Sequence, residues 1–126
     1  MTILEAITRI DELKPNTYTQ DEKVAWLSTV DGVVKRDVID THLRNEDEPE
    51  VTFNGYDEDT PVDTELLVYP PYDELYVLWL ECMIDYTNGE YSKYNNASIR
   101  FNDMQNQYMN DYNRRHMPKG TKIRYF

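Results

Sequence analysis

Apolar residues recur at three- and four-residue spacing along most of the chain, which is the pattern of amphipathic α-helices. The first helix is predicted to begin after Thr2, where a Thr-x-x-Glu arrangement can satisfy the free amides of a helix start, and to end before Pro15. A second capping arrangement at Thr19 opens a longer helix, which we expect to reach about Leu43. Gly32 lies in the middle of that helix and costs about 1 kcal/mol relative to Ala, so a break there is the alternative.

Two more helices are predicted in the second half of the chain. The helix over 72–88 is apolar around most of its circumference, which is typical of a helix packed against several neighbours. Gly89 can then close a tight turn, and a final helix from about Tyr91 to shortly before Pro118 carries apolar and aromatic positions at alternating spacings of three and four. We expect these two helices to form an antiparallel hairpin. Its predicted core is Leu75, Trp79, Cys82, Met83, Tyr94, Phe101 and Tyr108.

The helical pattern is interrupted over residues 45–65. The stretch 46–65 holds nine acidic residues and no Lys or Arg, together with Pro and Gly. Because like charges repel and little can be buried, the stretch predicts a loop that is most mobile over 46–64. Short extended pieces at 51–53 and 66–69 are compatible with it. The predicted fold is therefore all-α, a bundle of about four helices with a long acidic loop between the second and the third.

The length and the charge limit the classes of function. A chain of 126 residues fits one domain, 1–126, and its 24 acidic and 13 basic residues give a net charge of −11. Such a chain is a poor general binder of nucleic-acid phosphates or of an anionic membrane surface. No apolar run approaches the length of a membrane span, so we expect no membrane association. Only the segment 113–126 is basic, with five Lys or Arg and no acid.

Few residues of the chain suggest reactive chemistry. His42 and His116 are the only histidines and belong to no metal-binding motif, so neither a metal nor another cofactor is expected. Glu81 and Asp85 lie one helical turn apart and could be paired catalytic carboxylates. The alternative is an acidic stripe that faces water or a basic neighbour, and the sequence favours it because it shows no pocket partner for the pair. We therefore expect the protein not to be an enzyme.

Tyrosine is unusually frequent. Eight of the eleven tyrosines fall between Tyr69 and Tyr112, more than one helix–helix contact needs. Tyr buries a large apolar area and keeps a polar hydroxyl, which suits interfaces between subunits. The surplus tyrosines Tyr72, Tyr76 and Tyr86 are therefore candidates for a second surface that meets another subunit.

Several short segments resemble one small family of phage proteins. They are Pro71-Tyr-Asp-Glu-Leu-Tyr76, Trp79-Leu-Glu81, Ile84-Asp-Tyr86, Asn88-Gly-Glu-Tyr91, Lys93-Tyr-Asn-Asn96 and Tyr112-Asn113-Arg114. Together they resemble the head–tail connector, or adaptor, proteins of tailed bacteriophages and prophages, which are encoded next to the major capsid protein. With further matches near the amino terminus, the resemblance covers nearly the whole chain.

The resemblance implies an all-helical structural subunit without catalytic activity. About a dozen copies would form a homo-oligomeric ring beneath the portal protein, attach the tail-completion protein, and let DNA pass without specific binding. The protein would be made in the cytoplasm of the bacterial host and reside at the head–tail junction of the virion.

The residues themselves suggest where such contacts would lie. The candidate surface for a neighbouring subunit or the portal comprises Arg114, Arg115, Lys119 and Lys122 with the three surplus tyrosines, and its acidic counterpart could be the 46–65 loop. Two other functions stay open. One is an acidic host-directed adaptor or DNA mimic, and the more remote one is a small hydrolase that uses Glu81 and Asp85.

Overall fold

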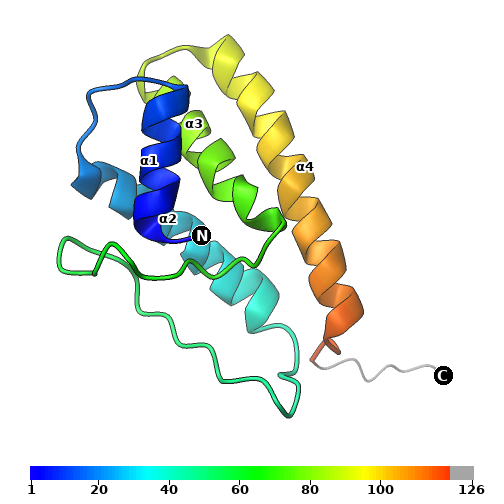
Figure 1. The fold of residues 1–126 in the computed structure, drawn as a ribbon. Helices are drawn as coiled ribbons and strands as arrows, with labels where there is room; N and C mark the ends of the chain where they lie inside the picture. The colour runs from blue at the N-terminus through cyan, green and yellow to red at the C-terminus, as the bar shows by residue number, and fades with distance from the viewer. Residues whose placement is uncertain (120–126) are drawn as a thin grey trace.

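The computed structural model describes residues 1–119, and the ordered elements in this range are all helical (Figure 1). They are α1 (Ile3–Leu13), α2 (Gln20–Val34), the π-helical turn η1 (Lys35–Ile39), the 3₁₀ turn η2 (Tyr72–Glu74), α3 (Leu75–Thr87) and α4 (Tyr91–Arg115). Helix α3 lies between α1 and α4, and α2 crosses the lower part of the bundle (Figure 1). The predicted all-α bundle is confirmed.

Helices α1 and α2 begin directly after Thr2 and Thr19, the two capping residues that the sequence predicts. The Thr2 hydroxyl accepts a hydrogen bond from the amide of Glu5, and the Glu5 carboxylate accepts one from the amide of Thr2. Thr19 likewise accepts from the amide of Glu22 at the start of α2. The α3–α4 turn is closed by Gly89, whose φ of 76° is a conformation that L side chains rarely adopt.

Gly32 does not break the second helix. Helix α2 runs through it to Val34, and the irregularity comes afterwards, where the amide of Asp40 donates to the carbonyl of Lys35 across five residues. The helical turns end at Ile39, four residues before the predicted end. Packing stabilises a glycine inside a helix despite its low propensity, and here Phe53 from the loop lies against Gly32.

Helix α3 supplies the centre of the core. Its residues Leu75, Tyr76, Leu80 and Ile84 are all 0% exposed. Four of the seven predicted hairpin core residues are buried; the three that are only partly buried are Trp79, Met83 and Tyr94. Trp79 sits at the margin because its indole N–H donates to the carbonyl of Trp26, 2.8 Å away.

Residues 40–71 form neither a helix nor a strand, so the predicted extended pieces at 51–53 and 66–69 do not become strands. The segment is nevertheless joined to the bundle. The carbonyls of Val62 and Thr64 accept hydrogen bonds from the start of α1, and Leu66 and Val68 are buried in the core. High mobility over 46–64 stays a prediction.

Candidate functional site

The seven candidate interface residues are distributed over three places. Arg114, Arg115 and Lys119 lie at the carboxyl end of α4, whereas Lys122 lies outside the described residues. Tyr86 lies at the far end of the hairpin, beside the α3–α4 turn. The remaining two, both tyrosines, lie in the interior or at its edge.

Tyr76 is a core residue and is not available for a contact with another subunit, contrary to the prediction. Its ring is fully buried, and its hydroxyl donates to Asp31 and accepts from the amide of Val68, 2.7 Å away. Tyr72 is half-buried, and its ring packs against the rings of Tyr69 and Tyr108. The helix predicted over 72–88 is apolar around most of its circumference, so its sequence pattern does not show which of its tyrosines faces the interior.

The sequence pattern did not single out Asp31, whose carboxylate accepts a hydrogen bond from the Tyr76 hydroxyl. Asp31 is 0% exposed and accepts from Tyr76, from Tyr56 in the loop and from the amide of Leu67. Burial raises the pKa of Asp31 although these donors act in the opposite direction. The burial of Asp31 could have been predicted, because position 31 falls on the same face of α2 as Leu27 and the other apolar positions. These bonds make Asp31 the link between α2, α3 and the loop.

Tyr86 is exposed and belongs to an aromatic cluster, which we define as Tyr86, Tyr91 and Tyr94. Tyr86 is 54% exposed and Tyr91 is 59% exposed. The Tyr86 ring meets those of Tyr91 and Tyr94 edge to face, with centroids 5.9 and 5.3 Å apart. Exposed, mutually ordered aromatic rings are the side chains that interfaces between proteins favour.

The basic end of α4 is partly neutralised by its own chain. Arg114 and Arg115 both bind the Asp111 carboxylate, at 3.1 and 2.8 Å. The Tyr69 hydroxyl, with help from these two arginines, lowers the pKa of Asp111. The two guanidinium groups thus share one carboxylate, and their side chains remain 67% and 61% exposed.

The first part of the acidic loop lies against this basic end in the same subunit. The side-chain amide of Asn45 donates to the carbonyl of Arg115, and the His116 ring contacts both carboxylate oxygens of Glu48, at 2.9 and 3.1 Å. Burial acts to raise the pKa of Glu48, but the hydrogen bonds from His116 and the Asn45 amide outweigh it, so the pKa is lowered. The acids and bases that the sequence separates are therefore partly paired within one chain.

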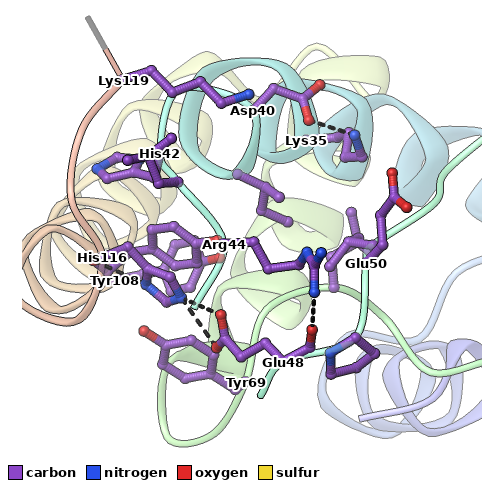
Figure 2. A pocket seen from close by; sticks show the side chains of 16 residues that line it. Lys35, Asp40, His42, Arg44, Glu48, Glu50, Tyr69, Tyr108, His116 and Lys119 are labelled. Carbon is purple, nitrogen blue, oxygen red and sulfur yellow. Dashed lines mark hydrogen bonds and ion pairs between the residues drawn. The ribbon is translucent and has the colours of Figure 1, made fainter. Parts of the chain in front are cut away.

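A pocket of about 380 Å³ opens where η1, the loop and the end of α4 meet (Figure 2). Its walls combine apolar and aromatic side chains, among them Tyr108 and Tyr112, with charges of both signs on the rim. His116 stacks on Tyr112 with ring centroids 3.9 Å apart and carries the bond to Glu48 across the pocket (Figure 2). We call this the carboxyl-end pocket.

The paired carboxylates of α3 are held by basic residues. Asp85 is fully buried and binds the Lys14 ammonium at 2.5 Å, while Glu81 binds Arg100 at 3.0 Å. Both carboxylates thus meet basic neighbours, which is the interpretation that the sequence favours, but Oδ2 of Asp85 is buried without a hydrogen-bond partner among residues 1–119. The thiol of Cys82 is buried beside the Ser98 hydroxyl, 3.8 Å away, and burial raises its pKa.

Residues 1–119 contain neither a metal-binding cluster nor a helix that could span a membrane. No three His, Cys, Asp or Glu side chains in this range are grouped to hold a metal ion. No helix in the described part of the chain is long and apolar enough to cross a membrane.

Comparison with known proteins adds no relative. Neither a protein-family model, nor a curated protein, nor a solved structure matches this chain. The function has to be argued from the residues and their arrangement.

Proposed function

We propose that the chain is a head–tail connector subunit of a tailed bacteriophage, which forms a ring beneath the portal protein and joins the capsid to the tail. The observation that carries the proposal is the separation of two chemically different exposed surfaces on one hairpin. The aromatic cluster lies beside the start of α4, whereas the exposed Arg114 and Arg115 and the carboxyl-end pocket (Figure 2) lie near its other end. Helix α4 has 25 residues and is about 37 Å long at 1.5 Å per residue, so surfaces near its two ends are well separated.

Separated, unlike surfaces suit a ring. In a head-to-tail contact one patch of a subunit meets a different patch of the next, and the contact closes into a ring when the rotation allows it. A subunit that met its partner through the same patch on both sides would form a dimer instead. The resemblance of the sequence to connector proteins adds to this argument.

The overall charge fits a passage for DNA. At a net charge of −11 the subunit repels phosphates, so a lumen lined by such subunits would let the duplex slide. The exposed arginines at the end of α4 are then left for an acidic patch on the portal, or for a neighbouring subunit. In this proposal the protein needs no cofactor and acts at the head–tail junction of the virion, after synthesis in the host cytoplasm.

The test is association with the portal protein encoded in the same genome. Wild-type protein mixed with that portal at low salt should give rings in electron micrographs and co-elute in gel filtration. A variant with Arg114, Arg115, Lys119 and Lys122 changed to Glu should bind at least tenfold more weakly. Lys93→Glu, at the opposite end of α4, is the matched control and should bind as the wild type does.

Deletion of the gene from the phage tests the same proposal in the cell. The expected product is DNA-filled heads without tails. Failure to associate with the portal at low salt, or normal tailed particles after deletion, would overturn the connector function.

A further inference from the structure

The carboxyl-end pocket has uncovered apolar side chains at its mouth. Leu43 and Val51 both line it and are 48% and 37% exposed. Its volume of about 380 Å³ lies within the range of ligand pockets, roughly 300–1,000 Å³, and gives room for one or two large side chains. A pocket of this size with apolar and aromatic walls suits a large side chain of a bound polypeptide.

The acidic residues at the Glu50 margin of the pocket favour a basic segment. Three Lys or Arg, two His and three acidic residues line it, and two ion pairs join some of them, Lys35 with Asp40 and His116 with Glu48. Glu50 stands on the rim without a cation among the described residues (Figure 2). Glu46 and Asp47 lie a few residues before it, are exposed, and also have no cation within residues 1–119. The margin near Glu50 is therefore acidic.

The chain itself contains a segment of the complementary chemistry. The last described residue, Lys119, lines the pocket, and seven residues follow it, Gly120-Thr-Lys-Ile-Arg-Tyr-Phe126. This segment alternates basic Lys122 and Arg124 with apolar and aromatic residues. Fully extended, seven residues reach about 24 Å.

The direction of the chain at the rim favours a neighbour's segment over the subunit's own. Residues 117–119 run antiparallel to 41–43: the amide of Leu43 donates to Met117 and the amide of Lys119 donates to Thr41, at 2.7 and 2.8 Å. This register carries the backbone from Leu43 back toward Thr41, away from the segment that leads from Leu43 to Glu50. Lys119 and Glu50 lie on different sides of the pocket (Figure 2). To reach Glu50 in its own subunit, the chain would have to reverse direction directly after Lys119.

We propose that the carboxyl-end pocket of one copy receives residues 120–126 of the neighbouring copy. An apolar or aromatic side chain of the segment enters the pocket, and Lys122 and Arg124 pair with Glu50 and the acids beside it. This inference rests on the proposed ring, because it names one of the contacts between successive subunits, the one at the carboxyl-end pocket; the aromatic cluster is left for another.

The first experiment uses a fluorescent peptide of the sequence of residues 120–126 and the full-length protein at a concentration where it is monomeric. The peptide should bind with an increase in fluorescence anisotropy. Glu50→Lys should weaken it about threefold, as expected for one partly exposed ion pair, and Val51→Arg should weaken it at least tenfold by blocking the mouth. The matched controls Glu58→Lys and Ile99→Arg change exposed residues that do not line the pocket and should leave binding unchanged.

The second experiment places a photo-crosslinking residue at Tyr125 in the full chain. Irradiation at assembling concentration should join residue 125 to a pocket residue of another chain and give a ladder of multimers. Absence of peptide binding, equal binding by Val51→Arg and Ile99→Arg, or cross-links only within single chains would each overturn the inference. Portal binding is measured separately, so the connector function can stand if this contact fails, and the contact can stand if the portal is not a partner.

Discussion

At the scale of single residues, the buried polar groups carry the most information. Asp31 binds two tyrosine hydroxyls and one backbone amide, so the loop, α2 and α3 share one carboxylate. The tyrosines fall into two groups, those in the interior and those at the surface. Those that reach this carboxylate or the aromatic interior hold the fold together, and those of the aromatic cluster are free for a partner.

Tyr76→Phe should lower the free energy of unfolding by about 1–3 kcal/mol, because it removes a donor to Asp31 and leaves the Val68 amide without its acceptor. The matched control is Tyr86→Phe, at an exposed ring, which should change stability by less than about 0.5 kcal/mol. Urea unfolding of both variants checks this. Equal effects of the two substitutions would show that the Tyr76 hydroxyl is not engaged in the interior.

Asp31→Asn should show a distinct dependence on pH. Burial raises the pKa of Asp31 in the folded chain above the ordinary value of an aspartate, so the folded state holds the proton more tightly than the unfolded state does. Asp31 therefore stabilises the fold fully at pH values below its pKa in the unfolded chain. This stabilisation is lost as the pH rises through the pKa of Asp31 in the folded chain. The stability lost in the variant should be largest near pH 4 and should shrink toward pH 8. Unfolding across this range measures it, and a loss that grows with pH would contradict it.

At the scale of elements, α3 is the helix around which the others pack, and each neighbour is tied to it by a polar contact as well as by apolar ones. Lys14, at the end of α1, reaches Asp85 on α3, and Arg100 on α4 reaches Glu81. The helix–helix arrangement thus depends on ion pairs that the amphipathic pattern does not reveal.

Lys14→Met should destabilise the protein by about 3–5 kcal/mol, because Asp85 is fully buried and would lose its counter-charge. The control Arg36→Met breaks an exposed pair with Asp37 and should cost less than about 0.5 kcal/mol. Adding Asp85→Asn to the Lys14→Met variant should recover part of the loss. Thermal or urea unfolding of the three variants gives the comparison, and no recovery would argue against an uncompensated charge as the cause.

The loop should exchange its amide hydrogens fastest over 46–64 and α3 should exchange them slowest. Exposed, like-charged residues have few contacts to protect their amides, whereas α3 is central to the core. Within the loop we expect partial protection at Tyr56, whose amide donates to the Ser28 hydroxyl at 3.0 Å. Strong protection across all of 46–64 in a monomer would show the mobility prediction to be wrong.

At the scale of the whole molecule, exposed groups of different chemistry lie far apart. The aromatic cluster and the carboxyl-end pocket lie at opposite ends of the longest helix, and both are available for contacts with other chains. This arrangement predicts that assembly and folding can be separated by mutation.

Replacing Tyr86 and Tyr91 together by Ser should leave the monomer within about 1 kcal/mol of wild-type stability, since both rings are more than half exposed. Self-association, measured by sedimentation at increasing protein concentration, should fall at least tenfold. Ile99→Ser, at a residue 67% exposed in the middle of α4, is the control for a general loss of apolar surface. If Ile99→Ser weakened self-association as much as the double substitution, the aromatic cluster would have no specific part in the proposed ring contact.

The sequence by itself determined the four helices, the starts of α1 and α2, the Gly89 turn and the irregular segment over 45–65, because capping side chains, prolines, glycines and apolar spacing act locally along the chain. Only the tertiary structure decided that Tyr76 faces Asp31, that Asp85 pairs with Lys14, and that Glu48 in the loop meets His116. The partners in these contacts are separated by 45, 71 and 68 residues. Which charges and tyrosines remain exposed depends on such distant pairings, and no local pattern encodes them.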